Sequence, residues 1–211
     1  MRGKIIGYVC LLAVFCTCVI SEVQAARPSS QTDQWGIALG IGWNKFTGSS
    51  ANDTGIVPSN LSGFSIGVAS ERLLKPGMAV YSEINYAQKG SRYSVRGEYG
   101  QTVEIDWKVS YLETPVALRF FLGQNSRIPR PTPFLDLGFY AAYKIDSSAE
   151  GLNLNDVIEN FDFGGYLGGG VNLPMGTNNF QASLHFKPGL FTIDAGDAKN
   201  SSFILTGALL F

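Results

Sequence analysis

Seven charged side chains interrupt segments of the sequence that are otherwise apolar, aromatic or rich in glycine. They are Glu83, Glu113, Arg119, Asp136, Lys144, Asp162 and Lys187. Glu83 and Glu113 are the two that could exchange protons with a substrate, because a pair of carboxyl groups can act as general acid and general base. That chemistry needs a cleft that holds the substrate between them. Whether such a cleft exists depends on the elements that carry the two residues.

Other kinds of site have less support. The single histidine, His185, has too few partners for a zinc site or a catalytic triad. The glycine run at 168–170 lies inside an alternating segment, where glycine permits bending or close packing rather than phosphate binding. We therefore expect no cofactor and no metal ion. A calcium site in the loops is a weak alternative, and its ligands would be Asn52, Asp53, Thr54, Asp146 and Asp156.

The charged residues lie in segments whose side chains alternate in character with a period of two, which is the period of a β-strand. In residues 35–44, for example, large apolar side chains alternate with glycine, alanine and asparagine. Eight such segments are expected, at 35–44, 64–69, 80–86, 103–120, 134–145, 161–173, 180–190 and 203–211. Their lengths suit tilted strands that cross a bilayer.

The segment 103–120 changes phase part-way along. Residues up to Val109 keep one alternation, and residues from Leu112 keep the opposite one. A β-bulge between Tyr111 and Pro115 would supply the extra residue, and it would also accommodate the proline, which cannot donate a hydrogen bond to a sheet.

Each expected strand has one apolar face and one face of glycine, small or polar residues. A soluble barrel would bury the apolar face, whereas a membrane barrel turns it toward lipid. The membrane arrangement is favoured because a narrow lumen has little room and because aromatic residues recur near strand ends, as in an aromatic girdle. Those residues are Trp35, Trp43, Tyr86, Tyr143, Phe161 and Phe211. The predicted fold is all-β: an eight-stranded antiparallel up-and-down transmembrane β-barrel.

The N-terminal 25 residues differ from the rest. Arg2 and Lys4 precede an apolar run, 5–20, that is short for a spanning helix, and small residues surround Ala25. This order predicts a signal peptide at 1–25 and a barrel domain at 26–211. All three cysteines lie in the signal peptide, so no disulfide is expected in the barrel.

Expected connections alternate between short turns, at 73–77 and 174–179, and longer loops, at 47–61 and 147–160. Short turns belong on the periplasmic side, which places both termini there. The terminal Phe211, which follows alternating apolar residues, is typical of a signal for the barrel-assembly machinery. A net charge of −1 without a clustered basic face excludes nucleic acid as a partner.

On such a barrel the charged residues face the lumen. If 103–120 and 134–145 form a hairpin, Arg119 lies directly opposite Asp136. The charges could line a selective channel or plug the lumen, and we favour the plug, since small barrels are filled by side chains and buried charges have to be paired. A filled lumen leaves no cleft for Glu83 and Glu113, so we predict that the protein is not an enzyme.

Several segments resemble PorT-like outer-membrane barrels. They are EINYAQKGS at 83–91, YLETPVAL at 111–118, GFYAAY at 138–143, and FDFG with GGGV at 161–164 and 168–171. The order of these segments matches over nearly the whole mature chain, although Thr114 and Phe139 depart from the usual residues. The resemblance implies a barrel in the outer membrane of a Gram-negative bacterium. The founding member of that family is associated with protein secretion.

Three functions remain open. The favoured one is a non-catalytic, monomeric outer-membrane barrel with a structural or partner-binding role, linked to secretion or to contacts at the cell surface. Its expected partners are the lipid bilayer, the assembly machinery and proteins not yet identified. The alternatives are a narrow pore for small solutes and a soluble periplasmic ligand-binding barrel.

Overall fold

The computed structural model describes residues 33–48, 57–96, 101–123, 130–149, 152–153, 159–192 and 198–211. The predicted signal peptide at 1–25 lies outside these residues. The strands are β1 (Asp33–Thr47), β2 (Val57–Lys75), β3 (Met78–Arg96), β4 (Thr102–Phe121), β5 (Thr132–Ala149), β6 (Leu152–Asn153), β7 (Phe161–Met175), β8 (Asn178–Pro188) and β9 (Lys199–Leu210). Within the described part, no helix is both long enough and apolar enough to span a membrane.

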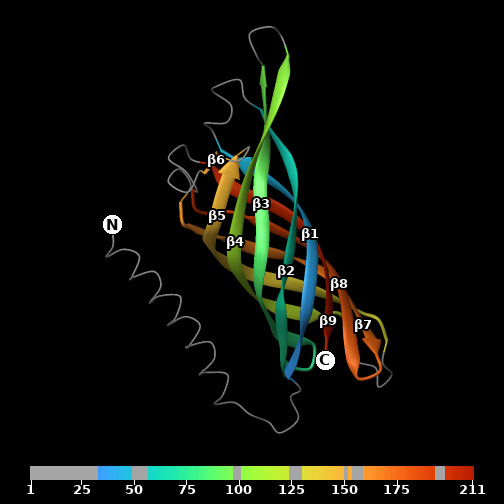
Figure 1. Ribbon diagram of the computed structural model, residues 1–211. Coiled ribbons are helices and arrows are strands. Elements are labelled where there is room, and N and C mark those ends of the chain that lie inside the picture. Colours follow the sequence, from blue (N-terminus) through green and yellow to red (C-terminus); the bar gives the residue numbers. More distant parts are fainter. Residues whose placement is uncertain are drawn as a thin grey trace, which may run out of the picture. The chain divides into compact units, whose positions relative to one another are not determined.

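Eight strands close into a ring. The order β4-β3-β2-β1-β9-β8-β7-β5 is completed by pairing of β4 with β5, and each pairing is antiparallel. The two-residue strand β6 only extends the edge of β5. Because β1 pairs with β9 from Gly36↔Leu210 to Thr47↔Lys199, the first and last strands seal the barrel. The predicted eight-stranded up-and-down topology is confirmed, and Figure 1 shows the tilt of its strands.

The outer surface of the ring is apolar. On β1, Ile37, Leu39 and Ile41 each expose more than half of their surface, whereas Gly36 and Ala38, between and beside them, are buried. The other strands alternate in the same sense. A soluble protein rarely exposes a contiguous apolar surface of this extent, so lipid is the solvent that this surface requires. The predicted orientation is confirmed, and the soluble-barrel alternative is wrong.

Exposed aromatic residues lie near both ends of the strands. Trp35 and Phe211 are exposed at the end where the chain's last strand finishes, and Trp43 and Tyr143 are exposed toward the other end. Aromatic rings at these levels suit the two interfaces of a bilayer.

Short turns and long connections lie at opposite ends. The β2–β3 and β7–β8 turns each contain a glycine with positive φ, Gly77 at 82° and Gly176 at 68°. At the same end, the backbones of Trp35 and Phe211 exchange hydrogen bonds of 3.1 and 2.7 Å. By the rule that short turns are periplasmic, we expect this end to face the periplasm and the other to face the exterior, and the two ends are named accordingly below.

On the exterior side, part of the wall rises above the rest. Pairing of β1 with β2 ends at Asn44↔Leu61, but β3 and β4 stay paired as far as Arg96↔Thr102. Both β2 and β5 follow this rise. We call residues 57–60, 91–96, 102–107 and 148–149 the rim sheet, and Figure 1 shows β3 and β4 extending past the neighbouring strands there. The centre of the rim sheet is the outer part of the β3–β4 hairpin.

The predicted change of phase in β4 is wrong. Val109, Tyr111 and Glu113 all point inward, so β4 keeps one alternation. A pairing irregularity does occur between Ser110 and Tyr111, but the extra residue is Ile145 on β5. The sequence pattern changes within β4 because the inward side chains themselves change from polar to apolar toward the exterior.

Candidate functional site in the lumen

All seven charged residues expected to face the lumen are buried inside the barrel: Glu83, Glu113, Arg119, Asp136, Lys144, Asp162 and Lys187. They occupy the inward phase of β3, β4, β5, β7 and β8. Hydrogen bonds and ion pairs bring five of them into two groups, one nearer the periplasm and one nearer the exterior.

The periplasmic group is built around Arg119 of β4. This residue pairs in register with Asp136 of β5, as predicted. The guanidinium donates from Nε and Nη2 to the two carboxylate oxygens, each at 2.7 Å. Its Nη1 donates to Glu71 at 2.7 Å and to Gln181 at 2.6 Å. Such bidentate, charge-assisted bonds fix the guanidinium in one orientation.

Aromatic rings occupy the space beside this guanidinium. The Arg119 Cζ atom lies 3.9 Å from the ring centroid of Tyr81 and 3.8 Å from that of Phe134. Both contacts are cation–π interactions, which gain strength away from water. Arg119 is only 1% exposed, so rings and partners together exclude solvent at this level of the lumen.

His185, the only histidine, belongs to the same group. Its Nε2 lies 2.9 Å from Asp136 Oδ2, and its ring stacks on Tyr166 with 4.3 Å between centroids. Its Nδ1 is buried without a hydrogen-bond partner among the described residues. The residue therefore packs in the lumen and does not face the periplasmic water.

The exterior group is centred on Glu113 of β4. Lys89 lies 2.6 Å from Glu113 Oε2, and Lys187 lies 2.5 Å from Oε1, so the carboxylate is held between two ammonium groups. Lys89 also lies 3.1 Å from Asp162. Asn200 donates to that second carboxylate at 2.8 Å. Charges of both signs are thus paired inside the barrel, as burial requires.

Glu83 has separate partners. Its carboxylate accepts hydrogen bonds from the hydroxyl of Tyr81 and, at 2.8 Å, from the amide of Asn85. Glu113 is engaged by two lysines instead. The two glutamates therefore have different partners and do not form an acid–base pair around a shared space.

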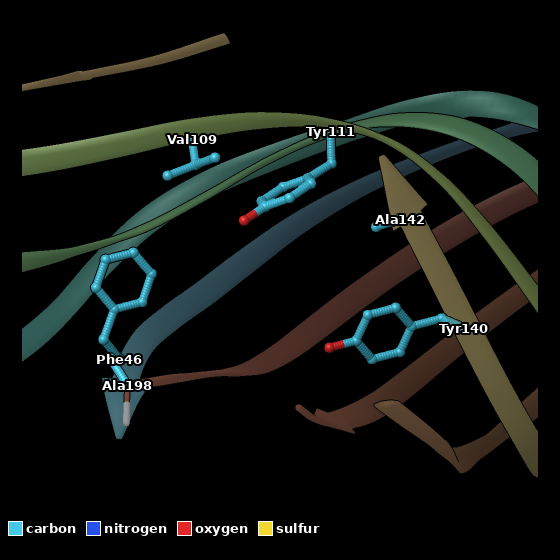
Figure 2. Packing of buried hydrophobic residues seen from close by; sticks show 6 residues of the cluster. All are labelled: Phe46, Val109, Tyr111, Tyr140, Ala142 and Ala198. Atoms are coloured by element: carbon cyan, nitrogen blue, oxygen red, sulfur yellow. The ribbon is translucent and has the colours of Figure 1, made fainter. Parts of the chain in front are cut away.

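Toward the exterior, an apolar plug follows the charged groups. It consists of Phe46, Val109, Tyr111, Tyr140, Ala142 and Ala198, and Tyr93 and Trp107 pack against it. Figure 2 shows that the six come from segments far apart in the sequence and lie inside the wall. Polar groups join the plug to the exterior group, because the Tyr140 hydroxyl donates to Asp162 at 3.1 Å. Between the charged groups and the exterior end, the lining of the lumen therefore changes from polar to mainly apolar under the rim sheet.

A second Arg–Asp pair lies on the outer face of the rim sheet, beyond the apolar, lipid-facing part of the outer surface. Arg92 donates from Nε and Nη2 to Asp106 at 2.6 and 3.1 Å, and it lies 3.2 Å from Glu104. The hydrogen bond from Arg92 lowers the pKa of the Asp106 carboxyl below its usual value. The side chains of Arg92 and Asp106 are 40% and 29% exposed, so water screens this pair.

Metal ligands are not assembled among the described residues, where no group of three or more His, Cys, Asp or Glu side chains could hold an ion. Of the residues suggested for calcium, Asn52, Asp53, Thr54 and Asp156 lie outside the described part of the chain. Asp146 is exposed on β5 beside the bulge.

Sequence reasoning missed four members of the lumen groups: Glu71, Lys89, Gln181 and Asn200. Lys89 was detectable, because the inward phase of 81, 83 and 85 continues to 87 and 89 once β3 is recognised as longer than 80–86. Glu71 was hidden because β2 runs well past residue 69.

The chain matches the model of the outer membrane protein beta-barrel domain family over residues 25–195. It belongs to that family. Together with the lipid-facing outer surface of the barrel, this family membership places the protein in the outer membrane, surrounded by the bilayer. No curated protein matches the chain.

Solved structures support the fold. The chain is similar to Neisserial surface protein A, with a TM-score of 0.52, 11% identity, and coverage of 86% of this chain and 98% of that one. It is also similar to the outer membrane protein OprG from Pseudomonas aeruginosa, with a TM-score of 0.53, 9% identity, and coverage of 85% and 94%. At these identities the likeness concerns the fold alone.

Proposed function

We propose that this outer-membrane barrel is a closed, non-catalytic protein with a structural or partner-binding role. The observation that carries the proposal is a set of ion pairs and hydrogen bonds that cross the lumen between strands that are not neighbours. Arg119 of β4 bonds to Gln181 of β8, and Lys187 of β8 bonds to Glu113 of β4. Lys89 of β3 meets Asp162 of β7.

These bonds join opposite walls of the ring, so an ion would have to break them to pass. The apolar plug adds a second barrier, because its side chains are mostly apolar and its two tyrosine hydroxyls are already hydrogen-bonded, so a hydrated ion finds few polar partners to replace its water. A filled lumen also gives no cleft for a substrate, which argues against catalysis. The narrow pore is therefore the less favoured alternative.

The rim sheet is the surface that we propose for contact with partners. It stands above the barrel at the exterior and carries charged side chains on one face, including Arg92, Glu104 and Asp106. The resemblance to PorT-like barrels favours a partner connected with secretion or with the cell surface.

Planar-bilayer recordings test closure. Wild-type protein, with its folding verified by a heat-modifiable gel shift, is expected to show no resolved channels. A triple variant with Phe46→Ala, Glu113→Ala and Lys187→Ala weakens the apolar plug and the exterior group but keeps the Arg119 group. Its current is therefore expected to stay below that of a variant that also carries Arg119→Ala. Resolved channels in the wild type would contradict the closed barrel.

Cross-linking on intact cells tests the partner surface. Replacing residues 91–107 by a two-residue turn is expected to shorten the hairpin at the pair Gly90↔Lys108 without opening the barrel. Loss of cross-linked products in this variant supports the proposal, and an unchanged product pattern defeats it.

For assembly, we propose that the exposed Phe211 acts as the C-terminal signal for the barrel-assembly machinery and that the protein is a monomer. The variant Phe211→Ala is expected to lower the amount of heat-modifiable barrel in the membrane. The same amount would exclude this role.

A further inference from the structure

Two lysines lie side by side on the outer wall at the exterior end of β1 and β9. The outward phase of β1 runs from Trp43 to Lys45, and that of β9 runs from Lys199 to Phe203. In the β1–β9 register, Trp43 pairs with Phe203 and Lys45 pairs with Ser201. The next outward position of β9 is Lys199, so the two lysines are diagonal neighbours on one face, a separation that long side chains can span.

These lysines differ from the two outward arginines that have acidic partners. On the rim sheet, Arg92 pairs with Asp106, and at the periplasmic end Arg72 pairs with Asp33 at 3.4 Å. Within the described residues, no carboxylate forms an ion pair with Lys45 or Lys199. Two like charges on adjacent strands are unfavourable by themselves, so the arrangement calls for an anion between them.

The depth of the pair in the membrane identifies the kind of anion. Directly below it, Trp43 and Phe203 expose 44% and 50% of their surface to lipid. The lysines are partly buried, which is the exposure expected of side chains whose alkyl parts lie along the wall while the ammonium groups reach the interface. Because this end faces the exterior, that interface is the headgroup region of the outer leaflet.

We propose that Lys45 and Lys199, with Ser201 between them, bind the phosphate of a phosphorylated glycolipid of the outer leaflet. The acyl chains of that lipid would pack on Trp43 and Phe203. The site thus recognises the lipid by its phosphate and by its position at the interface together.

Native mass spectrometry of the folded full-length barrel in detergent tests the site. Bisphosphorylated lipid A, chemically dephosphorylated lipid A and inorganic phosphate serve as separate probes. The variant Lys45→Ser/Lys199→Ser is compared with Lys75→Ser/Lys108→Ser, which removes the same charge from two exposed lysines elsewhere. The heat-modifiable gel shift confirms folding of each variant.

We expect the Lys45/Lys199 variant to bind bisphosphorylated lipid A with about tenfold lower affinity than the wild type. The reason is that each basic residue near an anionic surface raises the binding constant by roughly a few-fold. The control variant should bind like the wild type, and dephosphorylated lipid A should bind the wild type about tenfold more weakly. Equal affinity of the two variants overturns the proposal. Equal binding of dephosphorylated lipid overturns it too, as does full displacement of lipid A by millimolar phosphate, which would indicate a free-anion site.

Discussion

Two arginine–aspartate pairs on neighbouring strands of this barrel have nearly the same geometry and very different surroundings. Arg119 and Asp136 bridge β4 and β5 through two bonds of 2.7 Å, and Arg92 and Asp106 bridge β3 and β4 through bonds of 2.6 and 3.1 Å. The side chains of the first pair are 1% and 0% exposed, against 40% and 29% for the second.

The difference shows that burial, not geometry, decides what such a pair does. On the rim sheet, water and salt weaken the attraction, and loss of one partner leaves the other solvated. In the lumen, loss of one partner leaves a charge stranded away from water, which costs far more than the pair itself contributes. The lumen pairs therefore enforce one arrangement of the walls, whereas the rim pair adds little to the stability of the sheet on which it lies.

The largest effect is expected from Arg119→Met, which leaves Asp136 and Glu71 without their cation. We expect the free energy of unfolding to fall by about 3–5 kcal/mol, measured by urea titration in lipid vesicles. The combined variant Arg119→Met/Asp136→Asn/Glu71→Gln removes the stranded charges and should recover most of the loss. If the combined variant is less stable than the single one, the stranded-charge explanation is wrong.

A somewhat smaller effect is expected from Glu113→Gln, which keeps the side-chain shape but leaves Lys89 and Lys187 facing each other. Asp162 still neutralises Lys89. We therefore expect a loss of about 3 kcal/mol in the same urea titration, at the lower end of the range for broken buried pairs. Glu104→Gln, on the exposed rim, is the matched control and should leave the midpoint unchanged; a similar loss in both would remove the distinction between lumen and rim.

The smallest effect concerns the acid titration of Asp106. Because its pKa in the folded protein is lowered, its pairing with Arg92 adds stability above the unfolded carboxyl pKa, about 3.9, and that stability is lost as the pH falls through the lower folded value. Carboxyl NMR in micelles should give a titration midpoint below about 3.9 that rises in Arg92→Gln. An unchanged midpoint would show that Arg92 does not cause the shift.

Strand number, topology, orientation and the pairing of Arg119 with Asp136 could be predicted from the sequence, because alternation fixes which side chains share a face and hairpin geometry then fixes the register. The partners across the lumen could not. Which residue of β8 meets which residue of β4 depends on strand tilt and on the closure of the ring. The β-bulge predicted in β4 was wrong for a related reason. A change of phase is inferred from alternation on the assumption that each face of a strand keeps one polarity along its length, but the inward face of β4 changes from polar to apolar.

Thiol accessibility tests the central claim, that small and charged residues fill a closed lumen while apolar residues face lipid. The three natural cysteines lie at positions 10, 16 and 18, outside the barrel strands, so single cysteines can be placed in the wall. In vesicles, Ala117→Cys and Ala142→Cys should resist both a small charged thiosulfonate and a lipid-soluble maleimide, whereas Leu118→Cys and Phe139→Cys should react with the maleimide alone. Rapid reaction of the two inward cysteines with the charged reagent would show an open, water-filled lumen and contradict the account.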